Sequence, residues 1–188
     1  SVSPHSHTFV TSLKACAKLR DYGRGTQIHA EVARMGLVEE DLFVGSALIN
    51  LYAKCGSFVK AHEVFDKLTI RNVVSWNSMI SSYADHGYGE ESLKSIEKMT
   101  LEGISPNSIT FLCVLNACSN LGLLGKGKEI HNTIVREGWL EKHALLGNAL
   151  VDMYAKCGLL VNAQEVFDEL SVRDVTSWTT LIAGYAQL

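Results

Sequence analysis

The stretch that decides the fold is Leu48-Ile49-Asn50-Leu51-Tyr52-Ala53-Lys54-Cys55-Gly56, because it returns 102 residues later as Leu150-Val151-Asp152-Met153-Tyr154-Ala155-Lys156-Cys157-Gly158. The same offset relates further residues on both sides of this stretch, namely Cys16 and Cys118, His29 and His131, Phe65 and Phe167, Arg71 and Arg173, and Trp76 and Trp178. A chain that repeats itself at a fixed period is built from tandem structural units.

Each 102-residue period contains three related units of about 36, 31 and 35 residues, and each starts a helical run with an equivalent segment. Those segments are Phe9-Val10-Thr11-Ser12-Leu13, Gly45-Ser46-Ala47-Leu48-Ile49 and Trp76-Asn77-Ser78-Met79-Ile80. Apolar residues recur at helical spacing, as in Ala61-x-x-Val64-Phe65-x-x-Leu68, and predict amphipathic helices. Gly56 and Gly158 predict helix ends, since glycine accepts the positive φ of a C-terminal cap. The pattern predicts an all-α fold of helical hairpins stacked into a solenoid.

Composition excludes several classes of protein. Of the 188 residues 47% are hydrophobic and 20% are charged, so the chain can bury a core. No apolar run reaches about 18 residues, and residues 1–8 lack the order of a secretory signal, so no membrane partner is expected. The odd count of five cysteines argues against a secreted disulfide framework. A net charge of -3 means that any contact with nucleic acid must rest on placed residues rather than on bulk charge.

The segment Val73-Val74-Ser75-Trp76-Asn77-Ser78-Met79-Ile80-Ser81-Ser82-Tyr83, closing at Gly103-Ile104-Ser105-Pro106-Asn107, resembles a standard pentatricopeptide repeat. The alternation of lengths resembles the long, short and standard order of the plant subclass, with Gly127-Lys128-Glu129-Ile130-His131 typical of long units. The resemblance covers essentially the whole chain and implies a right-handed superhelical α-solenoid of tandem helix-turn-helix hairpins.

The resemblance implies the following division of a single array over residues 1–188. Long units cover residues 6–41 and 108–143, short units cover 42–72 and 144–174, a standard unit covers 73–107, and a truncated standard unit covers 175–188. We therefore expect the chain to be part of a longer array.

In this family the first helix of each hairpin lines a groove, and its fifth residue together with the last residue of the unit selects an RNA base. The resemblance therefore implies three base-selecting pairs: Ser46 with Asn72, Asn77 with Asn107, and Asn148 with Asp174. By the family's code these pairs suggest adenine, a pyrimidine and uracil, while Thr179 suggests a purine. The long units pair Val10 with Asp41 and Leu112 with His143, whose aliphatic fifth residues cannot hydrogen-bond a base. Those units space the RNA or contact proteins.

Two further sets of positions follow from the resemblance. The second residues of the units would form apolar walls beside the bases, and they are Phe43, Val74, Ile109 and Leu145. Ordinary core packing is the alternative for these side chains. Lys18, Lys54 and Lys156 fall at the end of the first helix, where the resemblance places phosphate contacts. For the asparagines the alternative is a solvated or helix-capping amide.

Three motifs point elsewhere and are rejected. The segment Gly122-Leu123-Leu124-Gly125-Lys126-Gly127-Lys128 has phosphate-loop spacing, but Glu129 replaces the magnesium-binding hydroxyl and no strand precedes it. His29-Ala30-Glu31 resembles a deaminase motif without its Cys-x-x-Cys pair. Cys16, Cys55, Cys118 and Cys157 fall at helical repeat positions, Cys113 lies outside this pattern, and all five are predicted to pack rather than to bind metal. No catalytic residue, cofactor or metal is therefore expected in this chain.

The function that follows is sequence-specific binding of single-stranded RNA, about one base per unit. The subclass suggests the recognition part of an organelle RNA editing or processing factor, in the mitochondrion or chloroplast, with editing-factor proteins contacting the long units. The alternative is an α-solenoid scaffold for protein partners without RNA specificity. Apolar hairpin faces left without a capping unit also predict self-association of the array.

Overall fold

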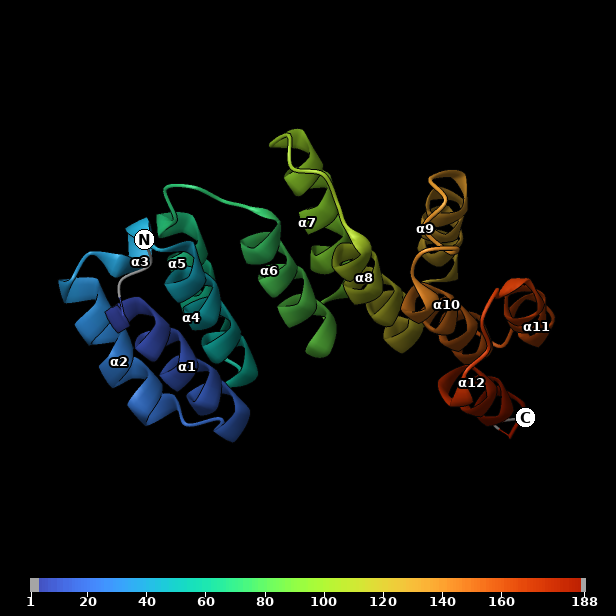
Figure 1. The fold of residues 1–188 in the computed structure, drawn as a ribbon, viewed down its shortest axis with the longest axis horizontal. Helices are drawn as coiled ribbons and strands as arrows, with labels where there is room; N and C mark the ends of the chain where they lie inside the picture. Colours follow the sequence, from blue (N-terminus) through green and yellow to red (C-terminus); the bar gives the residue numbers. More distant parts are fainter. Residues whose placement is uncertain (1–3, 187–188) are drawn as a thin grey trace. The chain divides into compact units, whose positions relative to one another are not determined.

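The computed structural model describes residues 4–186, and within this range the chain forms twelve α-helices and no strand (Figure 1). The helices are α1 (Pro4–Leu19), α2 (Tyr22–Arg34), α3 (Leu37–Glu40), α4 (Leu42–Lys54), α5 (Phe58–Lys67), α6 (Val73–Asp85), α7 (Gly89–Leu101), α8 (Ser108–Leu121), α9 (Leu124–Arg136), α10 (Ala144–Lys156), α11 (Leu160–Glu169) and α12 (Val175–Ala186). The predicted all-α fold of helical hairpins is confirmed.

The chain divides into two compact units that are described separately. The first unit comprises residues 1–82 and 95–105, and the second comprises residues 83–94 and 106–188. The border runs through α6 and α7, so each unit contains part of both helices.

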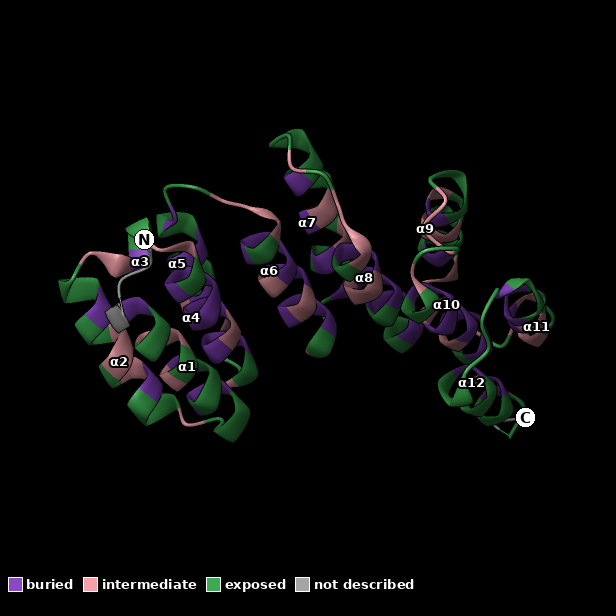
Figure 2. Cartoon of the chain, viewed as in Figure 1, coloured by how far each residue is buried: buried purple, intermediate pink, exposed green. Residues whose placement is uncertain are grey.

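In the first unit α4 is the central helix and packs against α1, α2 and α5. Its buried side chains run along almost its whole length, which Figure 2 shows as a nearly continuous band of buried residues. The helix carries no polar face between Val44 and Ala53 apart from Ser46 and Asn50, and this composition suits a helix covered on several sides. Phe65 of α5 extends this core to Trp76 of α6 through an edge-on contact with ring centroids 4.7 Å apart.

The second unit repeats this arrangement with α10 at its centre, packed against α8, α9, α11 and α12. Phe167 of α11 meets Trp178 of α12 at the same 4.7 Å centroid distance and nearly the same angle. Because both the sequence and the packing recur, the 102-residue period is a structural repeat as well as a sequence repeat.

Glycines allow α2 to approach α4 and α9 to approach α10. An added Cβ on Gly25 would lie 2.4 Å from a methyl carbon of Leu51, and one on Gly127 would lie 2.6 Å from the sulfur of Met153. These distances are shorter than carbon and sulfur contacts allow, so a side chain at either position would require the Leu51 or Met153 side chain or the helices themselves to shift.

The predicted helix ends at Gly56 and Gly158 are confirmed. Both glycines have positive φ, 72° and 76°, directly after α4 and α10. One element was not predicted: the short helix α3 at the end of the first long unit. It follows Gly36, whose φ of 71° turns the chain after α2 and lets Val38 return to the core.

Candidate nucleic-acid interface

The fifth residues of the short and standard units are buried polar side chains on the first helices of their hairpins. Ser46 of α4, Asn77 of α6 and Asn148 of α10 are 7%, 8% and 6% exposed. The Oγ of Ser46 and both amide atoms of Asn148 meet no hydrogen-bond partner. A buried polar group without a partner costs stability, so its retention calls for an explanation. Thr179 of α12 differs, because its hydroxyl is exposed and donates to the carbonyl oxygens of Val175 and Thr176.

Asn148 and Asp174 are brought together in the second unit. The main-chain N–H and the hydroxyl of Ser177 donate to the Asp174 carboxylate and hold the pKa of that carboxyl below its ordinary value, with a smaller contribution from the Asn148 amide. Asn148 thus lies near the carboxylate, yet neither of its amide atoms completes a hydrogen bond of normal geometry. The pair presents an ionised acceptor beside an amide that can donate and accept.

The last residues of the units cap the helices that follow. The Oδ1 of Asn72 accepts from the N–H groups of Val74 and Ser75 at 2.9 and 3.0 Å, at the start of α6. Asn107 forms a capping box with Thr110 at the start of α8, and both reciprocal bonds measure 3.0 Å. The capping role considered for these asparagines is therefore real, and it fixes their side-chain oxygens. It leaves the Nδ2 group of Asn72 without a hydrogen bond among the described residues.

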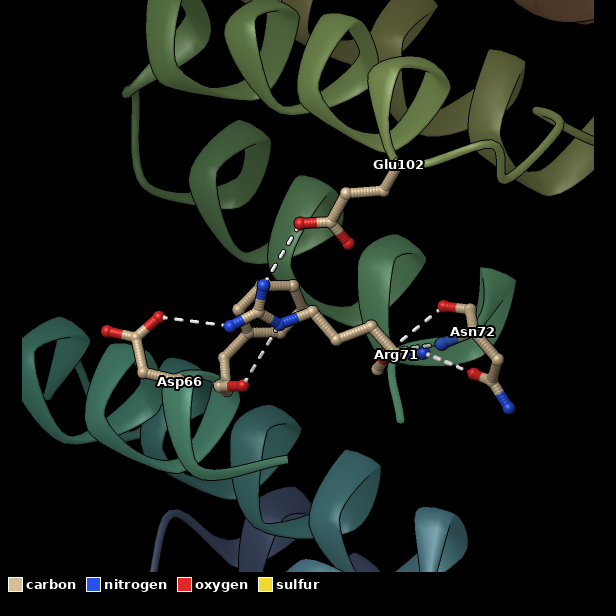
Figure 3. Close-up of polar contacts among 6 residues, drawn as sticks. Asp66, Arg71, Asn72 and Glu102 are labelled. Carbon is tan, nitrogen blue, oxygen red and sulfur yellow. Dashed lines mark hydrogen bonds and ion pairs between the residues drawn. The ribbon is translucent and has the colours of Figure 1, made fainter. Parts of the chain in front are cut away.

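Arg71 holds the segment that carries Asn72 (Figure 3). Its Nε donates to the carbonyl oxygen of Phe65 at 3.4 Å, and its guanidinium lies 4.7 Å from the centre of the Phe65 ring. One terminal nitrogen donates to Glu102 at 3.0 Å and the other lies 3.6 Å from Asp66, so the charge sits between two carboxylates (Figure 3). These contacts tie the linker between α5 and α6 to the end of α7.

Arg173, just before Asp174, makes contacts like those of Arg71 with the main chain and with a phenylalanine ring. Its Nε donates to the carbonyl oxygen of Phe167 at 2.9 Å, its Nη2 donates to the carbonyl oxygen of Asp168, and its guanidinium lies 5.4 Å from the centre of the Phe167 ring. The 102-residue offset relates the two arginines in the sequence, but it does not reveal that they place the cap residues.

The apolar residues at the second place of the units are exposed. Phe43, Val74, Ile109 and Leu145 are between 45% and 64% exposed, at the first turns of α4, α6, α8 and α10. Side chains this open to solvent do not belong to the core, so the core-packing alternative does not account for them. They remain available to contact a ligand.

The three predicted phosphate-contact lysines are all exposed at the ends of first helices, but their surroundings differ. Lys18 and Lys54 line a pocket in the first unit together with Lys14 and Arg20. Lys156 instead pairs with Asp152 at 2.9 Å. Its charge is therefore neutralised within α10.

The two long units have different surroundings at their expected base positions. Val10 and Asp41 line one pocket of about 320 Å³ that also includes Phe43. Leu112 is half-buried, and His143 stacks on Trp139 with ring centroids 5.2 Å apart. The first long unit thus offers open space at this position.

Two histidine–tyrosine hydrogen bonds join neighbouring hairpins, one between α2 and α4 and one between α9 and α10. They were not predicted from the sequence. His29 shares a 2.6 Å hydrogen bond with Tyr52, and His131 shares a 2.9 Å hydrogen bond with Tyr154. Burial lowers the pKa of both imidazoles and raises the pKa of Tyr52 to about 12. The recurrence of both residue types at the 102-residue offset was the available signal.

The other features to consider are the cysteines, metal binding and membrane spans. Cys16 and Cys118 are buried, and burial raises the pKa of the Cys118 thiol to about 11, which suits packing more than reactivity. In residues 4–186 no group of three or more histidine, cysteine or acidic side chains is arranged to hold a metal ion. None of the helices in this range combines the length and apolar character that a bilayer crossing requires.

Tandem hairpins with polar positions that recur along their first helices define a helical-repeat protein. The pentatricopeptide repeat model matches residues 46–73, 109–139 and 148–175, and the model described as PPR repeat family matches residues 71–120. Together these matches cover well over half of the chain. The chain therefore belongs to the pentatricopeptide repeat family.

Relatives from Arabidopsis thaliana agree with this assignment. A pentatricopeptide repeat-containing protein is 40% identical over 189 residues, which is 100% of this chain and 22% of the relative. Two others, named as mitochondrial and chloroplastic, are 39% and 37% identical, with 98% of this chain and 29% and 30% of the relatives covered. The chain thus spans less than a third of the length of these relatives.

Solved structures share the fold. The pentatricopeptide repeat protein PPR10 in complex with an 18-nucleotide psaJ RNA element superposes with a TM-score of 0.71 at 24% identity, covering 86% of this chain and 24% of that one. The pentatricopeptide repeat domain of protein-only RNase P 1 from Arabidopsis thaliana, in complex with tRNA, gives 0.61 at 14% identity, with coverages of 94% and 96%.

Proposed function

We propose that this chain binds single-stranded RNA in a sequence-specific manner, with about one base contacted per unit. The observation that carries the proposal is the unpartnered amide of Asn148, buried in α10 beside the Asp174 carboxylate. Such an amide lacks the partners that a bound base edge would supply. Unpaired RNA exposes those edges, whereas duplex RNA does not.

The chemistry of this pair agrees with its proposed preference for uracil. Uracil offers one ring N–H donor between two carbonyl acceptors, and Asn148 with ionised Asp174 offers an amide donor and carboxylate acceptors. Ser46 with Asn72 would take adenine, Asn77 with Asn107 a pyrimidine, and Thr179 a purine. The exposed Phe43, Val74, Ile109 and Leu145 would flank the bases.

We propose the same division into long, short and standard units as in the plant subclass. It is supported by the starts of α4, α6, α8, α10 and α12 at Leu42, Val73, Ser108, Ala144 and Val175, where the proposed units begin. The last two residues of the sixth unit, 187–188, lie outside the described residues. Within this proposal the chain supplies recognition to an organelle RNA editing or processing factor and performs no catalysis itself. The names of the mitochondrial and chloroplastic relatives support that setting.

The decisive experiment is selection from a pool of randomised single-stranded RNA, followed by binding of the selected sequence, its DNA equivalent and its duplex. We expect enrichment of uracil at one position and loss of that enrichment in Asn148→Leu. Equal binding to all three nucleic acids, or no enrichment, would contradict the proposal and favour a scaffold for protein partners.

We also propose that the chain self-associates through α12. Trp178 and Ile182 are 52% and 61% exposed there, whereas the equivalent Trp76 and Ile80 of α6 are 3% and 0% exposed. Sedimentation velocity over a range of concentrations should show a rising weight-average mass, and Ile182→Asp should reduce it. A single monomeric species at every concentration would contradict this expectation.

A further inference from the structure

The helices α6, α8 and α12 carry a buried hydroxyl at their third position. These residues are Ser75, Thr110 and Ser177, and each is at most 1% exposed. Each hydroxyl accepts a hydrogen bond from the main-chain N–H of the residue just before its helix, at 3.0, 3.0 and 3.2 Å. Those preceding residues are the second members of the proposed base-selecting pairs, namely Asn72, Asn107 and Asp174.

We propose that these hydroxyls are positioning residues for base selection, because each fixes the residue through which the start of its helix would meet a base. The inference rests on the proposed function and deepens it. The selectivity of a pair would depend on a third side chain, which is buried and contacts no base itself.

In α8 and α12 the hydroxyl bonds the side chain of the preceding residue directly. Thr110 Oγ1 donates to Asn107 Oδ1 at 3.1 Å, and the Ser177 hydroxyl donates to Asp174 Oδ1 at 3.0 Å. The main-chain N–H groups of Thr110 and Ser177 donate to the same two oxygens at 3.0 and 2.8 Å. One oxygen of each side chain is therefore held by two donors from a single residue.

Ser75 of α6 acts less directly on Asn72. Its main-chain N–H donates to Asn72 Oδ1 at 3.0 Å, but its hydroxyl donates to the main-chain carbonyl oxygen of Asn72 at 2.9 Å. The hydroxyl thus fixes the main chain of Asn72 and leaves its side chain to the N–H groups of the helix. We therefore expect the loss of this hydroxyl to have a smaller effect on selectivity than the loss of Thr110 or Ser177.

Holding one oxygen decides which group remains for a base. An amide whose oxygen is engaged offers its NH2 group, a donor, to a further partner, whereas a carboxylate held in the same way offers its second oxygen, an acceptor. The terminal torsion of asparagine and aspartate is broad and has no strong preference of its own. With one donor fewer, the side chain can turn and present either of its terminal atoms, so the favoured base loses part of its advantage.

The helices that follow the proposed long units lack this hydroxyl, since Val44 and Leu146 hold the third position of α4 and α10. Asp41 still caps α4 by accepting from the N–H groups of Phe43 and Val44 at 2.9 and 3.2 Å, whereas His143 makes no side-chain cap bond to α10. Both helices form all the same, so the hydroxyl is not required to start a helix. It is missing where the proposed fifth residue is aliphatic and present where a base-selecting residue precedes the helix.

The Asp174 carboxyl provides a signature of this positioning that needs no RNA. Hydrogen bonds from the main-chain N–H and then from the hydroxyl of Ser177 lower its pKa, and the Asn148 amide and the main-chain N–H of Thr176 contribute less. Removing the hydroxyl takes away one donor to the ionised form, so the pKa of Asp174 should rise towards its ordinary value.

The test removes each hydroxyl and then retains it in a conservative variant. Thr110→Val and Ser177→Ala remove the hydroxyl, whereas Thr110→Ser and Ser177→Thr keep it. Valine in α4 and threonine in α8 already stand at this position, so the fold accepts both residue types there. The matched control is Asp21→Ala, which removes the 3.0 Å cap bond from the Arg24 N–H at the start of α2. It weakens a helix start without touching a proposed base-selecting residue.

Competition among RNAs that differ at one base measures the base ranking at each selected position. We expect Thr110→Val and Ser177→Ala to weaken discrimination at their own position by about twofold to tenfold, the net worth of one hydrogen bond, and the two conservative variants to preserve it. Asp21→Ala should lower the melting temperature and leave the ranking unchanged. The carboxyl 13C signal of Asp174 should titrate at higher pH in Ser177→Ala and as in the parent in Ser177→Thr.

The outcomes separate this inference from the proposed function. A ranking that Thr110→Val and Ser177→Ala both retain, or a pKa of Asp174 that Ser177→Ala leaves unchanged, would overturn the positioning role alone. An equal loss of discrimination in Asp21→Ala would also overturn it, because the effect would then come from weakened helix starts in general. A parent protein that ranks the four bases equally at every position would instead reject the proposed function, and the inference with it.

Discussion

Replacing Asn148 with leucine should make the protein more stable and its RNA recognition worse. Asn148 is 6% exposed, and neither amide atom has a hydrogen-bond partner. Leucine is close to asparagine in shape but needs no partner, and it is the better helix former. The two expected effects have opposite signs, because an unpartnered amide destabilises the free protein but can hydrogen-bond a bound base.

The size of each effect follows from the burial of the amide. Leaving a buried polar group unpaired costs roughly 1 to 3 kcal/mol, and helix propensity adds up to about 0.7 kcal/mol in favour of leucine. For a chain of this length each kcal/mol raises the melting temperature by about 2 to 4 °C. A specific base contact is worth roughly 1 to 3 kcal/mol in comparable DNA cases, so discrimination should fall by about fivefold to 150-fold.

Thermal unfolding followed by circular dichroism gives the first effect, and competition among RNAs that differ only at the selected base gives the second. Ser46→Ala serves as a matched control in the first unit, since its Oγ is also buried without a partner and its loss should leave the uracil position unaffected. A variant that melts lower than the parent and ranks the four bases identically would refute both halves of the reasoning.

Three further outcomes test the packing that supports the site. Gly25→Ala should destabilise the protein by up to about 3 kcal/mol, and Gly127→Ala by about 1 kcal/mol. The Cβ at position 25 would meet the branched end of Leu51 at 2.4, 2.9 and 3.1 Å, whereas the Cβ at position 127 would meet a flexible methionine. Chemical denaturation of the two variants measures this order. Since burial lowers the folded pKa values of His29 and His131, the native state binds fewer protons than the unfolded state, and the melting temperature should fall as pH drops below the ordinary value of 6.5; a double His→Asn variant should flatten that dependence, and an unchanged slope would contradict it. Arg71→Lys should cost about 1 to 2 kcal/mol despite the retained charge, because lysine cannot keep the bond to the main chain together with both carboxylates; an urea midpoint equal to that of the parent would argue against this role.

The sequence was sufficient for the fold because each hairpin is encoded locally and then repeated. Helical spacing such as Ala61, Val64, Phe65 and Leu68 and the glycines after the first helices specify elements without reference to distant contacts. Repetition then supplies the tertiary arrangement, since a hairpin with one apolar stripe has to pack on its neighbour. The short helix α3 was not predicted from the sequence, because four residues carry too little periodicity to be recognised as a helix.

The candidate site could be predicted only in part. The repeat phase gives the positions of its residues, whereas the hydrogen bonding of their side chains depends on the surrounding residues. Phase places Asn72 at the last and Asn148 at the fifth position of their units, but only the structure shows that the oxygen of Asn72 is engaged in a helix cap and that the amide of Asn148 is unpaired. The positive φ of Arg20, 53°, was readable in principle. The counterpart of this residue at the 102-residue offset is Gly122, and an arginine in that place indicates a strained backbone.

The paired histidines and tyrosines bear on how such arrays can lengthen or shorten. Each bond joins α2 to α4 or α9 to α10, at the same boundary where Gly25 and Gly127 allow a close helix contact. Opening this boundary exposes a half-buried imidazole and a buried phenol at once, so both helices should exchange their amide protons in one cooperative event. On this reasoning the helices that each bond joins, α2 with α4 and α9 with α10, act as one structural module. A duplication or deletion that separates the two helices leaves one partner of such a hydrogen bond alone. One that keeps the helices together leaves every such bond intact.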